Sequence, residues 1–306
     1  MDRKKLIGNL LLLISAAVWG GGYLANAAAI KHIGVFTYET LRMAMGGIML
    51  LPFVLLSRSK EKKLPSPSKQ NNRALILGGI ACGVALVFAS ALQGFGLLYT
   101  TPGKGSFIAS LYIVIVPLLS SVIKRKLPNF LVWIGVIVAI VGFGFLSLGA
   151  GFGRINPGDM LMLACATVYS FQILLLSSIP RNIKTVTLAC IEFFAASFTA
   201  LILALIFDDI SLVTIGQALL PLLYAGIISG GIGFTLQAIA LTMTDADVGS
   251  LIMSLESVFA LLFAWILNAE VLLPREYLGC ALVFAAVLIS QFPTEKFKRK
   301  IKGVDQ

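Results

Sequence analysis

The chain has 306 residues, of which 58% are hydrophobic and only 12% are charged. Soluble domains carry about 45–50% apolar and about 25% charged residues, so this chain has half the charge that usually covers a water-facing surface. The composition excludes a soluble globular protein and a disordered one. It predicts a polytopic membrane protein.

Ten apolar runs follow one another along the chain, each close to the length of about 20 residues that a helix needs to cross a bilayer core. The longest polar stretch between them, 57–73, leaves no room for a soluble domain. Barrel strands alternate apolar and polar residues, and runs such as 132–141 do not. The sequence therefore predicts an all-α membrane protein with ten transmembrane helices, at 6–29, 35–56, 74–98, 105–123, 129–149, 158–179, 185–206, 215–240, 247–267 and 275–292.

The first run has the features of a secretory signal peptide, because basic residues precede it and Ala25-Asn26-Ala27 follows its apolar part. The run is about 20 residues long, which exceeds the usual apolar region of a signal. We expect it to be retained as the first span.

Basic residues are distributed unevenly between the two sides of the predicted bundle. With the N-terminus inside, 19 of the 24 lysines and arginines fall in cytoplasmic segments, four fall on the opposite side, and Arg42 lies within a span. This asymmetry predicts that both termini are cytoplasmic. The net charge of +10 is explained by this role in topology and by contact with anionic membrane lipid. It therefore gives no reason to expect nucleic acid as a partner.

The two halves of the chain are related to each other. At an offset of 144 residues, identical residues include the pairs 93/237, 100/244, 106/250 and 110/254, and at an offset of 150 Arg42 falls on Glu192. We therefore expect two five-helix repeats, 1–150 and 151–306, the second ending in a basic cytoplasmic tail. Because five is odd, the second repeat has inverted topology, a plan typical of secondary transporters.

The repeat and its motifs resemble the EamA family of the drug/metabolite transporter superfamily. The resemblance rests on Trp19-Gly20, on Arg42, on the fourth span 105-GSFIASLYIVIVPL and on 254-SLESVFALLFAWILNAEVL, and it covers nearly the whole chain. Where the family usually has a proline after the glutamate of the ninth span, this chain has Ser257. The resemblance implies a ten-helix transporter, exporter or importer, of amino acids or other small metabolites.

Other functions compete with that of a secondary transporter. A membrane enzyme is disfavoured because, away from their first turns, the spans contain neither aspartate nor histidine, and the lone His32 has no partner pattern. A channel and a lipid-linked metabolite flippase of the same fold stay open as alternatives. The sequence predicts no cofactor and no bound metal, a location in the plasma membrane, and leaves a homodimer open.

Four charged residues that lie away from the span ends are functional candidates, because charges inside the bilayer are costly. Glu39 and Arg42 are three residues apart on one helical face and could form an ion pair. Glu192 occupies the position in the second repeat that Arg42 has in the first, so these two charges could exchange partners or act as fixed structural groups.

Glu256 is the strongest candidate, since it lies about nine residues, or about 14 Å, into the ninth span. At that depth a carboxyl group could bind a cationic substrate group or take up a proton, and the alternative is a protonated side chain bonded to a neighbouring helix. We also expect polar and aromatic side chains to line a midplane cavity, so that the predicted substrate-binding residues are Trp19, Gln93, Tyr112, Tyr169, Gln172, Gln237 and Glu256.

Overall fold

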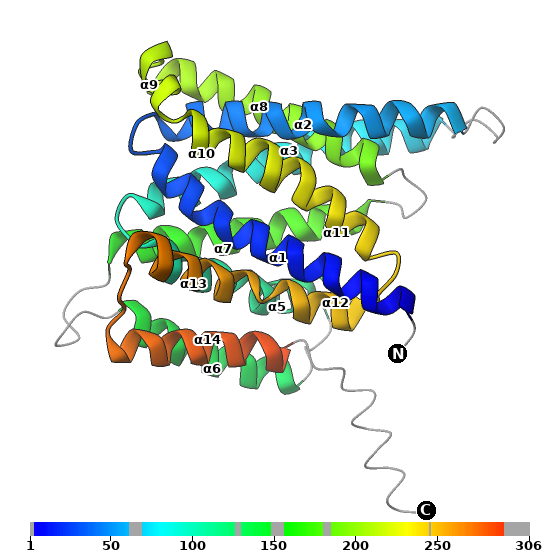
Figure 1. Cartoon of the computed structure of the whole chain (residues 1–306). Coiled ribbons are helices and arrows are strands. Elements are labelled where there is room, and N and C mark those ends of the chain that lie inside the picture. Colours follow the sequence, from blue (N-terminus) through cyan, green and yellow to red (C-terminus); the bar gives the residue numbers. More distant parts are fainter. Residues whose placement is uncertain are drawn as a thin grey trace, which may run out of the picture.

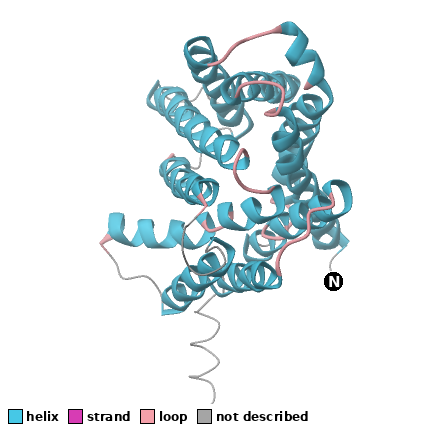
Figure 2. Cartoon of the chain, turned by 90° about the vertical axis from the view of Figure 1, so that its left-hand side faces the viewer, coloured by secondary structure: helices cyan, strands magenta, loops and turns pink. Residues whose placement is uncertain are grey.

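The computed structural model describes residues 3–60, 69–125, 130–147, 156–179, 185–244 and 246–290, and over these ranges it contains helices and loops but no strand (Figure 2). This confirms the all-α prediction. The helices are α1 (Arg3–Ala29), α2 (Val35–Lys60), α3 (Lys69–Leu97), α4 (Pro102–Ala109), α5 (Tyr112–Lys124), α6 (Phe130–Ser147), α7 (Pro157–Ser178), α8 (Thr185–Phe207), α9 (Leu212–Gln217), α10 (Leu219–Leu223), the π-helix η1 (Tyr224–Gly233), α11 (Phe234–Ala240), α12 (Ala246–Met253), α13 (Glu256–Asn268) and α14 (Pro274–Ser290).

Nine helical runs within the described residues are long and apolar enough to span a membrane. The expected tenth span coincides with α14, which has 17 described residues and is not among the nine, so the tenth span is not confirmed. Side chains such as Leu205, Ile206 and Phe207 are 66–69% exposed, as expected for helices that face lipid. The basic loops and the basic tail that set the predicted orientation lie mostly outside the described residues.

The helices run side by side across Figure 1, with α2 and α8 along one edge and α6 and α14 along the other. α2 packs against α8 and α6 packs against α14, so each of these pairs joins the first half of the chain to the second. We call the end at which α1 begins and α14 ends the N-terminal end of the bundle, and the opposite end, at which α2 begins, the far end.

Two of the predicted spans are interrupted near their middle. The fourth is divided into α4 and α5 at Ser110-Leu111, and the ninth into α12 and α13 at Ser254-Leu255. In both, the leucine N–H donates to the carbonyl three residues earlier, at 3.1 Å, which is a tighter turn than an α-helix makes. Both serine hydroxyls also donate to a carbonyl three residues earlier, at 2.7 Å. The ninth span therefore breaks although serine, Ser257, and not proline follows Glu256.

Two residues other than glycine have left-handed backbone conformations among the described residues. Arg125 has φ 51° and ends α5, and Ala269 has φ 50° and ends α13. They are 144 residues apart, the same offset that relates the two interruptions. The two interrupted spans thus share both a central turn and a C-terminal turn.

The eighth predicted span consists of α10, η1 and α11, with the π-helix η1 at its centre. Its glycines allow close approach to α2, because a Cβ at Gly226 would lie 2.6 Å from Met45 Cβ and one at Gly231 would lie 2.8 Å from Met49 Cβ. The wider π-helical turn leaves carbonyl groups to accept bonds from α1, as described below.

The four cysteines, Cys82, Cys165, Cys190 and Cys280, are free and buried within helices. Their exposed fractions are between 0 and 5%.

Candidate functional site

A cavity of about 410 Å³ lies between the two halves of the chain. Its walls come from α1, α2, α3, α7, α8, η1 and α11, and from the residues that flank the two interrupted turns. Nine of the ten predicted site residues line it: Trp19, Arg42, Gln93, Tyr112, Tyr169, Gln172, Glu192, Gln237 and Glu256. Their geometry is compatible with a binding site, and their binding of substrate stays a prediction.

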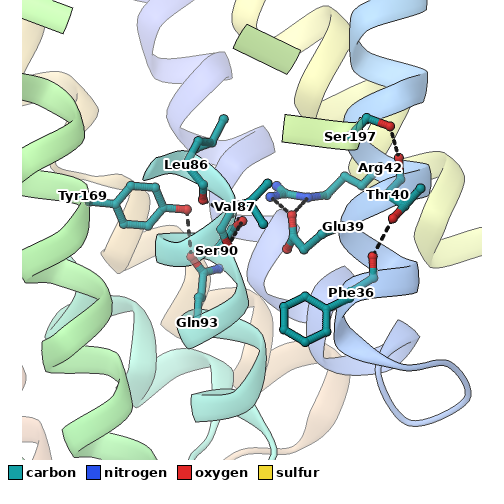
Figure 3. Close-up of polar contacts among 10 residues, drawn as sticks. All are labelled: Phe36, Glu39, Thr40, Arg42, Leu86, Val87, Ser90, Gln93, Tyr169 and Ser197. Carbon is teal, nitrogen blue, oxygen red and sulfur yellow. Dashed lines mark hydrogen bonds and ion pairs between the residues drawn. The ribbon is translucent and has the colours of Figure 1, made fainter. Parts of the chain in front are cut away.

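The tenth residue, Glu39, lies directly behind the wall and is fully buried. Its Oε2 accepts hydrogen bonds from Arg42 Nη2 at 2.7 Å and Nε at 3.2 Å (Figure 3). The Arg42 guanidinium also lies over the ring of Tyr38, 5.6 Å from its centroid. The ion pair therefore holds Arg42 in place at the cavity wall, and its Nη1 has no recorded partner among the described residues.

Glu192 has a different partner from the one that its repeat position suggested. Gln172 Nε2 donates to Glu192 Oε1 at 2.5 Å, which joins α7 to α8 at the cavity wall. In this conformation the partner of Arg42 is Glu39, and Glu192 is held by an uncharged amide.

Tyrosine and glutamine side chains form a third polar group. Tyr169 OH, from α7, donates to Gln93 Oε1, from α3, at 3.4 Å (Figure 3). The ring of Tyr169 is 6.5 Å from that of Tyr112, and Ser170 Oγ donates to the Tyr112 carbonyl at 3.4 Å. Gln237, the counterpart of Gln93 in the second half, lines the same cavity.

Trp19 is anchored to the π-helix. Its Nε1 donates to the Ser229 carbonyl at 3.1 Å, and Tyr224 OH donates to the Val18 carbonyl at 3.0 Å. Ser15 Oγ adds a contact with the Gly233 carbonyl at 3.2 Å. The indole donor is thus satisfied by backbone, and the ring contributes an apolar wall.

Tyr112 and Glu256 hold equivalent positions. Each is the first residue after an interrupted turn, and each faces the cavity. Among the described residues no hydrogen bond or ion pair is recorded for the Glu256 carboxyl group, which is partly exposed to the cavity. Glu256 is thereby the cavity carboxyl group that a ligand can reach without displacing a protein partner.

Sequence reasoning missed several cavity residues. Tyr23 and Asn26 line the cavity from α1, and Asn26 Oδ1 is buried without a partner. They follow Trp19 by four and seven residues, so helical spacing from Trp19 was a signal that could have identified them. Tyr38 and Ser229 also line the cavity.

The long apolar helices and their exposed apolar side chains define an integral membrane protein, and a cavity lies inside its helical bundle. A sequence model of the EamA-like transporter family matches twice, at residues 6–148 and 156–292. The chain belongs to the EamA-like transporter family. This confirms the resemblance inferred from the motifs, and the protein is a transporter that takes a small-molecule substrate.

Named relatives cover nearly the full chain. An uncharacterised transporter of Archaeoglobus fulgidus is 29% identical over 94% of this chain and 86% of its own length. The threonine/homoserine exporter RhtA of Escherichia coli K12 is 27% identical over 97% of this chain and 94% of its own length. A crystal structure that is 17% identical superposes with a TM-score of 0.63, covering 92% of this chain and 96% of that one, which supports the fold.

Proposed function

We propose that the protein is a secondary-active exporter of amino acids or similar small metabolites, with both termini cytoplasmic in the plasma membrane. The observation that carries the proposal is a single cavity that presents Arg42 and Glu256, two opposite charges, among uncharged hydrogen-bonding groups. The RhtA relatives, exporters of threonine and homoserine by name, support an amino-acid substrate.

The two poles of an amino acid match these two groups. Arg42 directs one edge of its guanidinium to Glu39 and can offer Nη1 to a substrate carboxylate. Glu256 can accept a substrate ammonium group, and Tyr112 and Tyr169 add aromatic surface beside it. Tyr169 lines the same cavity as Arg42 and Glu256.

Inverted repeats would give the two conformations that alternating access requires. The proposal of two repeats, 1–150 and 151–306, is supported by three features: the interrupted turns at Ser110 and Ser254, the left-handed turns at Arg125 and Ala269, and the double match of the family model. The packing of the third and eighth spans is also related. In the third span, α3 contacts α7 and α8, the first two spans of the second repeat, and in the eighth span η1 contacts α1 and α2, the first two spans of the first repeat.

The helices are packed differently at the two ends of the bundle. At the far end α4 packs against α13 and α1. The corresponding packing at the N-terminal end would join α12 to α5 and α7, and no comparable contact is recorded there among the described residues. The cavity extends toward that end along Ile173 and Leu176. We infer a state closed at the far end and open at the N-terminal end, which is the cytoplasmic side in our proposal.

Counterflow into proteoliposomes tests the substrate and its two poles. Vesicles loaded with threonine should accumulate radioactive threonine, and threonine should compete at least tenfold better than N-acetylthreonine or threonine amide, each of which lacks one charge. Glu256→Gln should selectively weaken the preference over N-acetylthreonine, with altered pH dependence of accumulation. Equal competition by all three compounds would contradict the two-pole site, and an ohmic current without counterflow would indicate a channel.

A further inference from the structure

At the far end of the bundle, a carboxylate reaches from the end of α13 to the start of α4. The left-handed residue Ala269 turns the chain, and the next residue, Glu270, donates its N–H to the Ala264 carbonyl at 3.1 Å. The Glu270 carboxylate then accepts hydrogen bonds from Thr101 Oγ1 at 2.5 Å and from the Gly103 N–H at 3.2 Å. A negative group placed at the first turn of a helix is stabilised by the unpaired N–H groups there.

Gly103 makes room for this contact. A Cβ at position 103 would lie 2.8 Å from Glu270 Oε1 and 2.8 Å from Leu261 Cδ1, so a larger residue would displace the Glu270 carboxylate and the end of the Leu261 side chain. The absence of a side chain at this position is therefore matched to the approach of Glu270.

The next residue along α4 fixes this helix to its other neighbours. Lys104 Nζ lies 2.7 Å from Asp159 Oδ2 at the start of α7 and 3.7 Å from Glu276 Oε1 at the start of α14. Thr100 Oγ1 donates to the second oxygen of Asp159 at 2.6 Å. Since α4 is bound to α7 by a buried ion pair, movement of α13 away from α4 must break the Glu270 contact at the far end. Deeper in the bundle it must also break the weaker contacts in which Ser106 Oγ donates to the Ser257 carbonyl at 3.3 Å and Ser257 Oγ donates to the Ser106 carbonyl at 3.4 Å.

We propose that Glu270 is the latch that holds the far end of the cavity closed. It is a positioning residue that biases the transport cycle, and the proposal rests on the alternating access proposed above. The hydrogen-bonded contact between Glu270 and Thr101 can break during transport, because Thr101 is exposed and Glu270 is half-buried. Water can therefore hydrate both side chains when the contact opens. A latch of this kind favours the closed end without preventing its opening.

Accessibility of a cavity residue from each face tests the latch. Ser229 lines the cavity from η1 and is partly exposed, and Ser229→Cys can be labelled with a membrane-impermeant maleimide in intact cells or in inside-out vesicles. In the otherwise unchanged chain, labelling should be faster from the N-terminal face. Glu270→Gln and, separately, Gly103→Ala should each raise the rate from the far face about fivefold or more, at the expense of the other face.

Asp208→Asn is the matched control. Asp208 Oδ2 accepts from the Thr37 N–H at 2.7 Å and from Thr37 Oγ1 at 2.9 Å, so it makes the same kind of contact at the same end, but between α8 and α2. It should leave the labelling ratio unchanged. Unchanged labelling in Glu270→Gln, or an equal rise in Asp208→Asn, would overturn the proposal. Labelling requires no substrate, so a latch response without threonine counterflow would refute the proposed substrate and leave the latch standing.

Discussion

The buried ion pair between Glu39 and Arg42 allows a quantitative test of the packing around the cavity. The Glu39 side chain is 0% exposed and that of Arg42 is 23% exposed. Removing one partner of a buried pair costs about 3–5 kcal/mol, because the remaining charge has lost its compensation. Because Arg42 borders the cavity, the destabilisation by Glu39→Gln should lie near the lower limit of this range. We expect the free energy of unfolding to fall by about 3 kcal/mol, which shifts the unfolding equilibrium more than a hundredfold.

Unfolding in mixed micelles of lipid and detergent, titrated with a denaturing detergent, measures this free energy. The set comprises the unchanged chain, Glu39→Gln, Arg42→Met and the double variant. Because each single change leaves one group buried without its partner, the double variant should be more stable than the sum of the single effects predicts. Single effects below about 1 kcal/mol, the range of exposed pairs, or strictly additive effects would refute the reasoning.

Three further predictions address the cavity, the backbone and the orientation. Gln93→Ala and Gln237→Ala should each lower threonine counterflow while the folded yield stays nearly unchanged; normal counterflow in both would remove them from the substrate path. Ala269→Gly should raise the free energy of unfolding by about 1 kcal/mol, since glycine adopts a left-handed turn without strain, and Arg125→Gly should act in the same direction. A cysteine at Ser66, which is outside the described residues, should resist impermeant maleimide in intact cells, and rapid labelling would reverse the predicted topology.

The spans could be predicted because a bilayer demands long apolar helices, and that demand is visible in composition alone. The interruptions could not, because Ser110 and Ser254 lie in runs with no glycine or proline at the break. Serine competes for the carbonyl of the preceding turn, which is a local effect with no periodic signature. The occurrence of serine at both positions, 144 residues apart, was the available signal.

The candidate cavity residues were found from the cost of polar groups inside a membrane, and nine of ten lie together. Their pairing was less predictable. Glu192 could have paired with Arg42 by charge, yet Gln172 is its partner, because α7 and α8 both pack against α3 and this brings the amide within reach. Glu270 was not a candidate, since it lies at the end of a span where a carboxylate is unremarkable by sequence.

The burial of all four thiols has a practical and a chemical consequence. Thiolate, the reactive form of cysteine, requires water or a positive neighbour, and thiols at 0–5% exposure in apolar helices are inert. The native thiols should therefore not react with water-borne alkylating reagents or mild oxidants. A fluorophore or spin label attached through one engineered cysteine would report from that position alone, without prior removal of the native four.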